Sequence, residues 1–503
     1  MGNSPHIRSI HILDDDSLLN IFYLYRPFFL GEDDGIFRLE GGRVPWDQGR
    51  WWYRLAHVCQ RWRNLILGSP SYFGLSLVCT NGTPVQDMLA HSPPIPLTVD
   101  YGRENGITAE DEEGILLALE QRDRVRHLRL NYPVQHLQKL LIMVDEEFPI
   151  LEYLIVDPLT MESTALMLPE TLQVPHLRHL TLIGFACPIR PRLHPAAASL
   201  VTLSLSIDHR SAYFQPNILL QWISFIPQLE SLAIGFSFPV PNRDVERQLI
   251  HTPIMTRITL LNLRLFWFRG VTAYLEAVVC RITTPRLESL RILSFTQLTF
   301  PFPRLAQFMH TTENIRFDNA EILFEDKQIS IGMSFRDADE YTFVVAVDCW
   351  HFDWQVSSMA QISNALIPVL SAVEHLTFDH EVHGRSSEER GDVDRVEWRK
   401  LLKSFSNVET LFAEDGLVEE LSRCLRLEDG EPPLELLPEL QELTYVGSRE
   451  TGDAFASFID ARQNAGRPVS LIRDSPSPSP LPFEPPAITS PNDVAGNDIK
   501  TSS

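Results

Sequence analysis

Lysine is scarce in this sequence of 503 residues, and arginine therefore carries nearly all of the positive charge. Lys and Arg together number 43 against 66 Asp and Glu, which gives a formal net charge of −23. A protein that binds the phosphate backbone needs a basic surface, so we expect no nucleic-acid partner. The lysines are Lys139, Lys327, Lys400, Lys403 and Lys500.

Cysteine is also rare, and no two cysteines are close enough to form a Cys-x-x-Cys or Cys-x-Cys pair. This spacing is typical of reduced thiols and excludes a disulfide framework or a zinc module. The sequence has no run of about 18 apolar residues, and its start lacks the apolar core of a signal peptide. We expect a cytoplasmic and/or nuclear protein with no membrane partner. The cysteines are Cys59, Cys79, Cys187, Cys280, Cys349 and Cys424.

Motifs of catalysis are missing as well. There is no GxGxxG, GxxxxGK[ST], GxSxG or HExxH. The segment Asp379-His380-Glu381-Val382-His383 is the nearest to a metal site, but it offers no evident third ligand. We therefore expect no enzyme, no catalytic residue, no metal and no cofactor. A hydrolase or transferase with an unrecognised site is the alternative.

What the sequence does contain is enough apolar material for a large core, since 44% of its residues are hydrophobic and 22% are charged. The two ends differ from the rest. Residues 1–9 are expected to be a flexible N-terminus. Residues 474–503 are rich in Ser and Pro, cannot build a core, and are expected to be a disordered tail.

A short cassette of the form apolar-x-x-apolar-x-apolar recurs along the chain, at first every 23 to 32 residues or so. Its last two apolar residues are two apart and point to one face of a short strand. Several copies follow a stretch with helical spacing, such as residues 218–226. Stacked at this period, the copies predict a right-handed α/β solenoid with parallel strands on its concave side. They begin at Val125, Leu151, Leu177, Leu200, Leu229, Met255, Leu287, Val373, Val408 and Leu440.

This cassette resembles the leucine-rich repeat over about 300 residues of the chain. The Asn or Cys of that family is mostly absent after the strand, and Phe185 and Phe295 stand there in two copies. We therefore expect an irregular α/β fold, with a leucine-rich-repeat-like domain at 120–473 after a connecting segment at 78–119. Residues 320–372 fit the period poorly and are expected to be an insertion or an extra hairpin.

Residues 10–77 carry a more specific signal, which is two amphipathic stripes. An acidic start, Asp14-Asp15-Asp16, precedes a first stripe that contains Leu18, Ile21 and Phe22. A second stripe runs from Leu55 to Ile66 at three- and four-residue spacing. Because so small a module cannot bury every large side chain that it carries, the surplus apolar surface favours a partner site over self-packing alone.

This segment resembles an F-box. The departures are Asp14 where the family has Pro, Gln60 where it has a basic residue, and an inserted loop at 27–50. With Asp14 in place of Pro, the start of the first helix is expected to be weaker. The insertion is similar to that of the expanded F-box family of mushroom-forming fungi. The matching residues are Leu13, Leu18, Ile21, Phe22, Leu55, Val58, Cys59, Trp62, Arg63, Leu65, Pro70 and Phe73.

The resemblance implies a substrate-recognition subunit of an SCF-type cullin–RING ubiquitin ligase, in which the F-box docks on the Skp adaptor. Phe22 and Trp62 are the expected hot spots. The repeats would then bind a protein substrate, and the alternative is a protein-interaction scaffold outside ubiquitination. The adaptor-binding residues are expected to be Leu13, Leu18, Ile21, Phe22, Leu55, Val58, Cys59, Trp62 and Leu65.

The solvent side of the concave strands is the expected substrate face. Arg and Tyr are favoured as interface anchors, although plain solvation of these side chains is an equal alternative. The candidate residues are His127, Arg129, Tyr153, His179, Arg257 and Arg291.

Overall fold

The computed structural model describes most of the chain between Leu13 and Asp474. The predictions for residues 1–9, the loop 27–50 and the tail beyond Asp474 lie outside the described residues. The described residues are 13–25, 51–102, 108–143, 147–158, 173–185, 198–208, 213–238, 257–295, 300, 302–312, 314–335, 340–380, 395–427, 431–432, 434–446 and 454–474.

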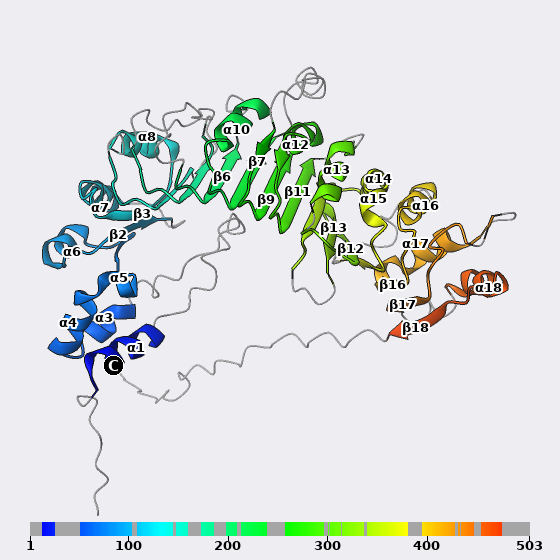
Figure 1. The fold of residues 1–503 in the computed structure, drawn as a ribbon, viewed down its shortest axis with the longest axis horizontal. Helices are drawn as coiled ribbons and strands as arrows, with labels where there is room; N and C mark the ends of the chain where they lie inside the picture. Colours follow the sequence, from blue (N-terminus) through cyan, green and yellow to red (C-terminus); the bar gives the residue numbers. More distant parts are fainter. Residues whose placement is uncertain are drawn as a thin grey trace, which may run out of the picture.

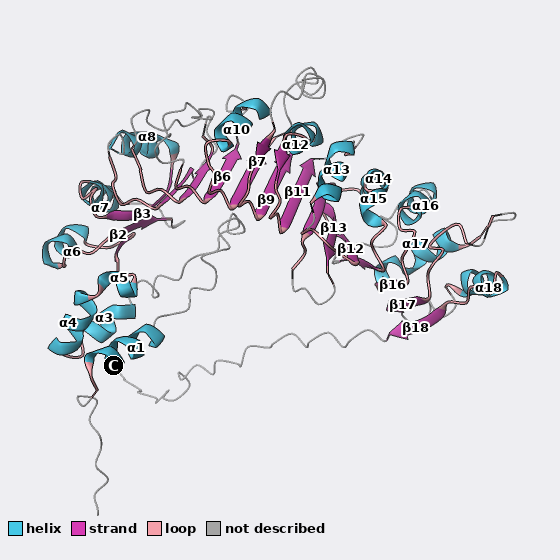
Figure 2. Ribbon diagram, in the orientation of Figure 1, coloured by secondary structure: helices cyan, strands magenta, loops and turns pink. Residues whose placement is uncertain are grey.

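The chain forms an arc whose inner side is one continuous sheet (Figure 1 and Figure 2). Sixteen strands of the described residues belong to this sheet. In spatial order they are β1 (Leu77–Cys79), β2 (Leu97–Tyr101), β3 (Val125–Tyr132), β4 (Tyr153–Pro158), β5 (His179–Ile183), β6 (Thr202–Ile207), β7 (Ser231–Phe236), β9 (Leu265–Gly270), β11 (Ser289–Phe295), β14 (Phe343–Asp348), β13 (Gln328–Ser334), β12 (Asn319–Phe324), β15 (His375–His380), β16 (Thr410–Ala413), β17 (Glu442–Val446) and β18 (Ser470–Asp474).

Helices cover the outer side of the arc (Figure 2). Four of them fall where helical spacing precedes a cassette, namely α10, α12, α16 and α17. Over much of the described chain strands and helices thus alternate, and the predicted α/β solenoid is confirmed. The helices are α6 (Val85–His91), α7 (Ala109–Leu119), α8 (Val134–Met143), α10 (Pro216–Ile223), α12 (Thr272–Val279), α13 (Pro303–Thr311), α14 (Phe352–Ala365), α15 (Ile367–Leu370), α16 (Arg395–Lys403), α17 (Asp415–Leu425) and α18 (Ala456–Asn464).

Residues 13–25 and 51–76 form a cluster of helices at one end of the arc, here called the N-terminal module (Figure 1). It consists of α1 (Asp15–Tyr25), α3 (Trp51–Ala56), α4 (Gln60–Gly68) and α5 (Pro70–Phe73). The chain then enters β1, so the module is joined directly to the first strand of the sheet. None of the helices in the described ranges is long and apolar enough to cross a membrane.

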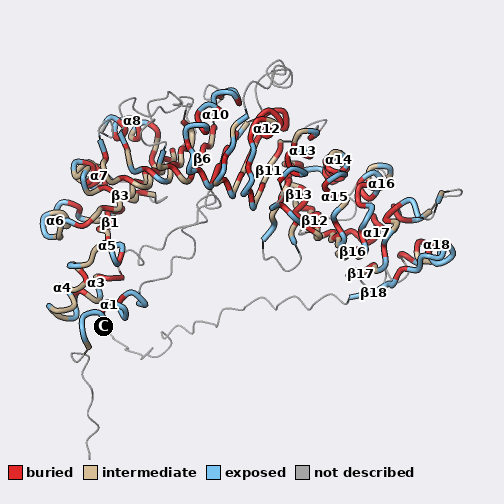
Figure 3. The backbone as a smooth tube through the Cα atoms, in the orientation of Figure 1, coloured by how far each residue is buried: buried red, intermediate tan, exposed pale blue. Residues whose placement is uncertain are grey.

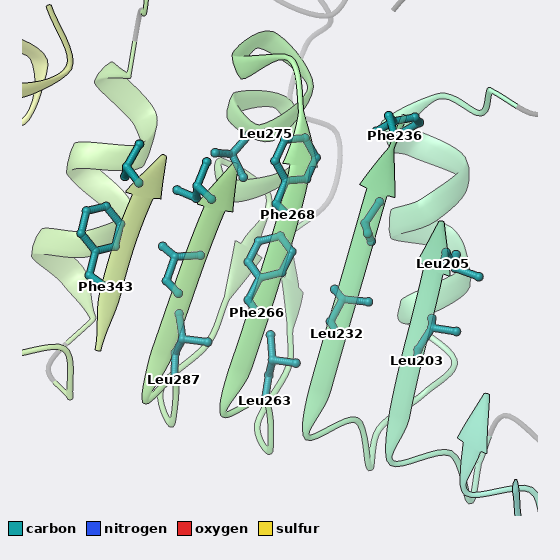
Figure 4. Close-up of a cluster of buried hydrophobic side chains, with 14 of the residues drawn as sticks. Leu203, Leu205, Leu232, Phe236, Leu263, Phe266, Phe268, Leu275, Leu287 and Phe343 are labelled. Atoms are coloured by element: carbon teal, nitrogen blue, oxygen red, sulfur yellow. The ribbon is translucent and has the colours of Figure 1, made fainter. Parts of the chain in front are cut away.

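Two side chains per strand, on the face of the sheet that the helices cover and here called inward, build the core of the solenoid. Figure 3 shows buried residues along the strands and on the helices above them. The pair Leu203 and Leu205 is in register with Leu232 and Ile234, which in turn align with Phe266 and Phe268. Figure 4 shows this row, which continues to Phe343 on β14. Each of these side chains is at most 5% exposed. Stacking identical positions therefore produces the buried rows that the cassette predicts.

The expected connecting segment 78–119 is part of this sheet. Its strand β2 pairs in parallel with β1 and β3, and Val99 and Tyr101 occupy the same inward positions as Leu128 and Leu130. The cassette is hidden here because Pro96 stands at its leading apolar position. The sheet therefore begins at Leu77 and not near residue 120.

The cassette at Met255 is a second correction. Its strand β8 (Ile258–Thr259) pairs with β10 (Ile282–Thr283) in a separate two-stranded sheet. The inward positions of the main sheet are taken instead by Phe266 and Phe268, with Leu263 leading them. Both segments have the same apolar spacing, and the larger aromatic pair occupies the core.

Strands β12, β13 and β14 form the extra hairpin expected near 320–372. Strand β13 runs antiparallel to both β12 and β14, and β14, not β12, pairs with β11. The inward row is kept, since Ile331 and Met333 of β13 align with Val345 and Phe343 of β14. A reversed strand fits because its side chains alternate in the same way.

The buried rows predict that replacing a buried leucine destabilises the fold far more than replacing an exposed one. Leu232→Ala removes a side chain that is 0% exposed, and should lower the free energy of unfolding by about 2–5 kcal/mol. Leu261→Ala is the matched control, because Leu261 is 60% exposed, and should change it by less than about 0.5 kcal/mol. Urea denaturation measures both, and equal effects would contradict the packing described.

Candidate interaction surfaces

The N-terminal module has a closed core of its own. Leu18 and Phe22 of α1 are 0% and 1% exposed. The Phe22 ring lies 4.7 Å from the Trp62 ring and 6.5 Å from the Phe73 ring. Leu18 and Phe22, which are among the expected adaptor-binding residues, are thus buried inside the module in this structure. The physical reason is that α1 places its main apolar face on α4 and α5.

The start of α1 is held by polar contacts at both the backbone and a neighbouring helix. The Asp14 carboxylate accepts a hydrogen bond from the Ser17 backbone N–H at 2.7 Å. The Arg61 guanidinium donates to the Asp15 carboxylate at 2.6 Å and to the Leu13 carbonyl at 2.7 Å. Asp14 therefore caps the helix and does not weaken its start. These contacts also fix α1 against α4.

Two of the expected adaptor-binding side chains are well exposed, Ile21 at 43% and Val58 at 58%. Leu13, Leu55, Trp62 and Leu65 are partly buried and pack against the module's core, and Cys59 is also partly buried. The sequence pattern missed further exposed apolar residues of the same helices. They are Tyr23, Leu24, Tyr25 and Tyr72, of which Leu24 is 80% exposed.

On the concave face, a ladder of side chains crosses five neighbouring strands, β2 to β6. The His127 ring meets the Tyr153 ring edge to face at 4.4 Å, and Tyr153 stacks on His179 at 4.1 Å with an angle of 6° between the planes. Each histidine Nδ1 also contacts a threonine hydroxyl, Thr98 at 3.2 Å and Thr202 at 3.1 Å. This set of five residues is here called the aromatic ladder.

Both imidazoles of the aromatic ladder are neutral near pH 7. Burial lowers the pKa of His127 to about 3, and the nearby Arg126 acts in the same direction. Burial likewise lowers the pKa of His179 to about 4, helped by Arg178. A neutral, flat and aromatic strip on a polar face suits contact with an apolar or aromatic side chain.

Charged and amide side chains run alongside the aromatic ladder. Arg129 lies 4.0 Å from the Asp100 carboxylate, and the Asn131 amide donates to Asp157 at 3.2 Å. Burial raises the pKa of Asp157 to about 6. Of the predicted substrate-face residues, His127, Arg129, Tyr153 and His179 are therefore brought together in one place.

The other two predicted residues lie elsewhere. Arg291 is on the concave face of β11, about 24 Å or five strand spacings from Tyr153, and pairs with Glu340 at 3.6 Å. Arg257 is exposed next to β8, outside the main sheet, because the strand expected at Met255 does not join it. Arg257 is thus removed from the candidate face.

The sequence reasoning missed Thr98 and Thr202, which close the aromatic ladder. Thr202 precedes an inward leucine, just as His127, Tyr153 and His179 do, so the cassette register was enough to find it. Thr98 could be found only by recognising residues 97–101 as a strand, from the alternation of Leu97, Val99 and Tyr101. Across the described residues, no group of three or more His, Cys, Asp or Glu side chains is placed to hold a metal ion.

Comparison with known proteins adds little. No protein-family model matches the sequence, and no curated protein matches it. A similar solved structure is the leucine-rich repeat-containing protein LegL7 from Legionella pneumophila, at 13% identity and a TM-score of 0.26. The alignment covers 78% of this chain and 98% of that one. The description of the fold as a leucine-rich-repeat-like solenoid rests on the strand pairing and register given above.

The aromatic ladder predicts a pH dependence of stability. The pKa of His179 is about 4 in the folded chain and about 6.5 when unfolded, so the unfolded chain binds more protons between these values. Stability should therefore fall as the pH drops through this window. His179→Gln cannot titrate and should show a shallower fall in urea midpoint from pH 6.5 to 4.5. Identical slopes for the two proteins would contradict the low pKa.

Proposed function

We propose that this chain is a substrate-recognition subunit of an SCF-type ubiquitin ligase. The N-terminal module would bind the Skp adaptor, and the concave face of the solenoid would bind a protein substrate. The observation that carries the proposal is the exposure of Ile21, Leu24, Val58 and Tyr72 on a module whose core is already closed. Apolar side chains that folding does not bury favour a partner surface.

The motif supports the kind of partner. The residues that match the F-box pattern divide into those that build the module, such as Leu18 and Phe22, and those left exposed, Ile21 and Val58. An adaptor would cover the second group by packing a helix surface on them. Tyr23 and Tyr72, whose rings lie 5.4 Å apart, would extend the same contact.

The aromatic ladder supports the second half of the proposal. Its neutral rings are bordered by Arg129 and Asp100, so a bound segment would find an apolar centre with a charged margin. This is the composition of protein-binding surfaces, in which aromatic residues and Arg are enriched. The module and the ladder belong to one chain, so a substrate would be held near the ligase without any catalytic group on this protein.

The adaptor half is tested with variants that leave the module's core intact. Ile21→Asp combined with Val58→Asp places charge at two exposed positions and should weaken binding of purified Skp adaptor by about 30-fold or more. Ile142→Asp is the matched control, since Ile142 is 73% exposed and belongs to α8, outside the module. Isothermal titration calorimetry on the full-length chain measures the three affinities.

Adaptor binding that survives the double change would remove this surface from the proposal. If the unmodified chain binds no Skp adaptor, the chain is better described as a protein-interaction scaffold outside ubiquitination, which is the second candidate. The same solenoid and ladder support that candidate equally well, so adaptor binding is the measurement that separates them.

A further inference from the structure

Two tryptophans stand exposed at one edge of the sheet, directly after β14. Trp350 is 60% exposed and Trp354 is 59% exposed. The Lys327 ammonium lies 4.7 Å from the centre of the Trp350 ring, and the His351 ring lies 5.5 Å from the Trp354 ring. These four residues are here called the tryptophan rim. Neither the adaptor surface nor the aromatic ladder includes them.

The tryptophan rim is built on rigid parts of the fold. The buried Gln355 side chain donates hydrogen bonds to the carbonyls of Glu325, Gln328 and Cys349, at 2.8, 3.2 and 2.9 Å. These bonds tie the turn that carries Lys327 to the start of α14. A surface held in place in this way loses little conformational entropy when it binds a partner.

The end of the described chain lies at the same edge of the sheet. Strand β14 is parallel to β12, because both are antiparallel to β13, and β12, β15, β16, β17 and β18 are parallel to one another. The carboxyl ends of β14 and β18 therefore point the same way. The described chain therefore ends, at Asp474, on the side of the sheet where Trp350 and Trp354 stand.

The sequence after Asp474 has the composition that aromatic surfaces recognise. Residues 475–491 contain seven prolines, and such a sequence favours the polyproline II conformation, which docks on exposed aromatic rings. Glu484 is the only charged residue in this stretch. The same chain thus carries an aromatic surface, on which Lys327 lies next to the exposed Asp326, and a proline-rich segment with one glutamate.

The distance from β18 to β14 decides which residues of the segment can reach the tryptophan rim. Six strand spacings separate β18 from β14, or about 29 Å at about 4.8 Å each. Polyproline II advances about 3.1 Å per residue, so a segment in this conformation would span that distance in roughly nine residues after Asp474. That position is Phe483, inside Pro482-Phe483-Glu484-Pro485-Pro486. Glu484 is the next residue along the chain.

We propose that residues 482–486 bind the tryptophan rim of the same chain, with prolines against Trp350 and Trp354 and Glu484 beside Lys327. A short connection of this kind gives an effective concentration of about millimolar, so even a weak contact is well populated. The occupants that compete with this one are a second copy of the chain and a separate proline-rich protein.

Photo-crosslinking in the full-length chain tests the proposal. With p-benzoylphenylalanine at position 483, the expected product is a cross-link within one chain to the peptide that contains residues 350–354, identified by mass spectrometry. The same probe at position 499 should give no enrichment there. Cross-links that map elsewhere on the solenoid, or that join two chains on a denaturing gel, would overturn the proposal in favour of another site or a second copy.

Variants make the test specific. Trp350→Ala combined with Trp354→Ala should lower the yield at the tryptophan rim by about tenfold or more. Phe335→Ala is the matched control, because Phe335 is 56% exposed at the opposite end of β13, and it should leave the yield unchanged. A yield that is insensitive to the double change would overturn the proposal.

A charge exchange gives a readout that does not depend on the tryptophans. Glu484→Lys should lower the cross-link yield, and Lys327→Glu in the same chain should restore it. Failure of the second change to restore the yield would remove Lys327 and Glu484 from the contact. Neither change touches Ile21 or Val58, so adaptor binding should stay as it is in the unmodified chain.

Discussion

The stacking of two inward side chains on every strand is the constraint on which the rest of the structure depends. Leu154 and Val156 align with Leu180 and Leu182, and the same two positions are filled from β2 to β17. Because side chains alternate along a strand, a slip of one residue would turn an entire row to solvent. The buried rows thus fix the register, and the register places His127, Tyr153 and His179 side by side on the opposite face.

The same core joins the two proposed binding surfaces. One cluster of buried side chains runs from Leu18 in α1 to Val469 before β18, through Phe73, Leu75 and the rows of the sheet. The N-terminal module and the concave face are therefore parts of one packed body. For a ligase subunit, this would hold a substrate at a set distance and orientation from the adaptor, which is how positioning accelerates a transfer reaction.

The repeats were predictable because each strand needs only its local spacing. Which of two similar segments or residues enters the core was not predictable, because that depends on packing between distant parts of the chain. The apolar spacing is the same at Met255 and at Leu263, and only the fit of Phe266 and Phe268 into the row decides between them. Helical periodicity placed both Ile21 and Phe22 on one stripe, but it does not tell which of the two the module buries. Pro96 hid β2, and with it Thr98 and one end of the aromatic ladder.

The hairpin of β12, β13 and β14 interrupts a sheet that otherwise grows by adding the next strand along the chain. Leu290 of β11 pairs with Phe343, and Asn319 of β12 pairs with His375, each across more than about fifty residues. In a regular repeat, the two paired strands are separated by about half as many residues. During synthesis, the sheet can extend one repeat at a time only as far as β11, and it must then wait until β14 has been made. The step from β11 to β14 is therefore a longer closure than those of the regular repeats that precede it.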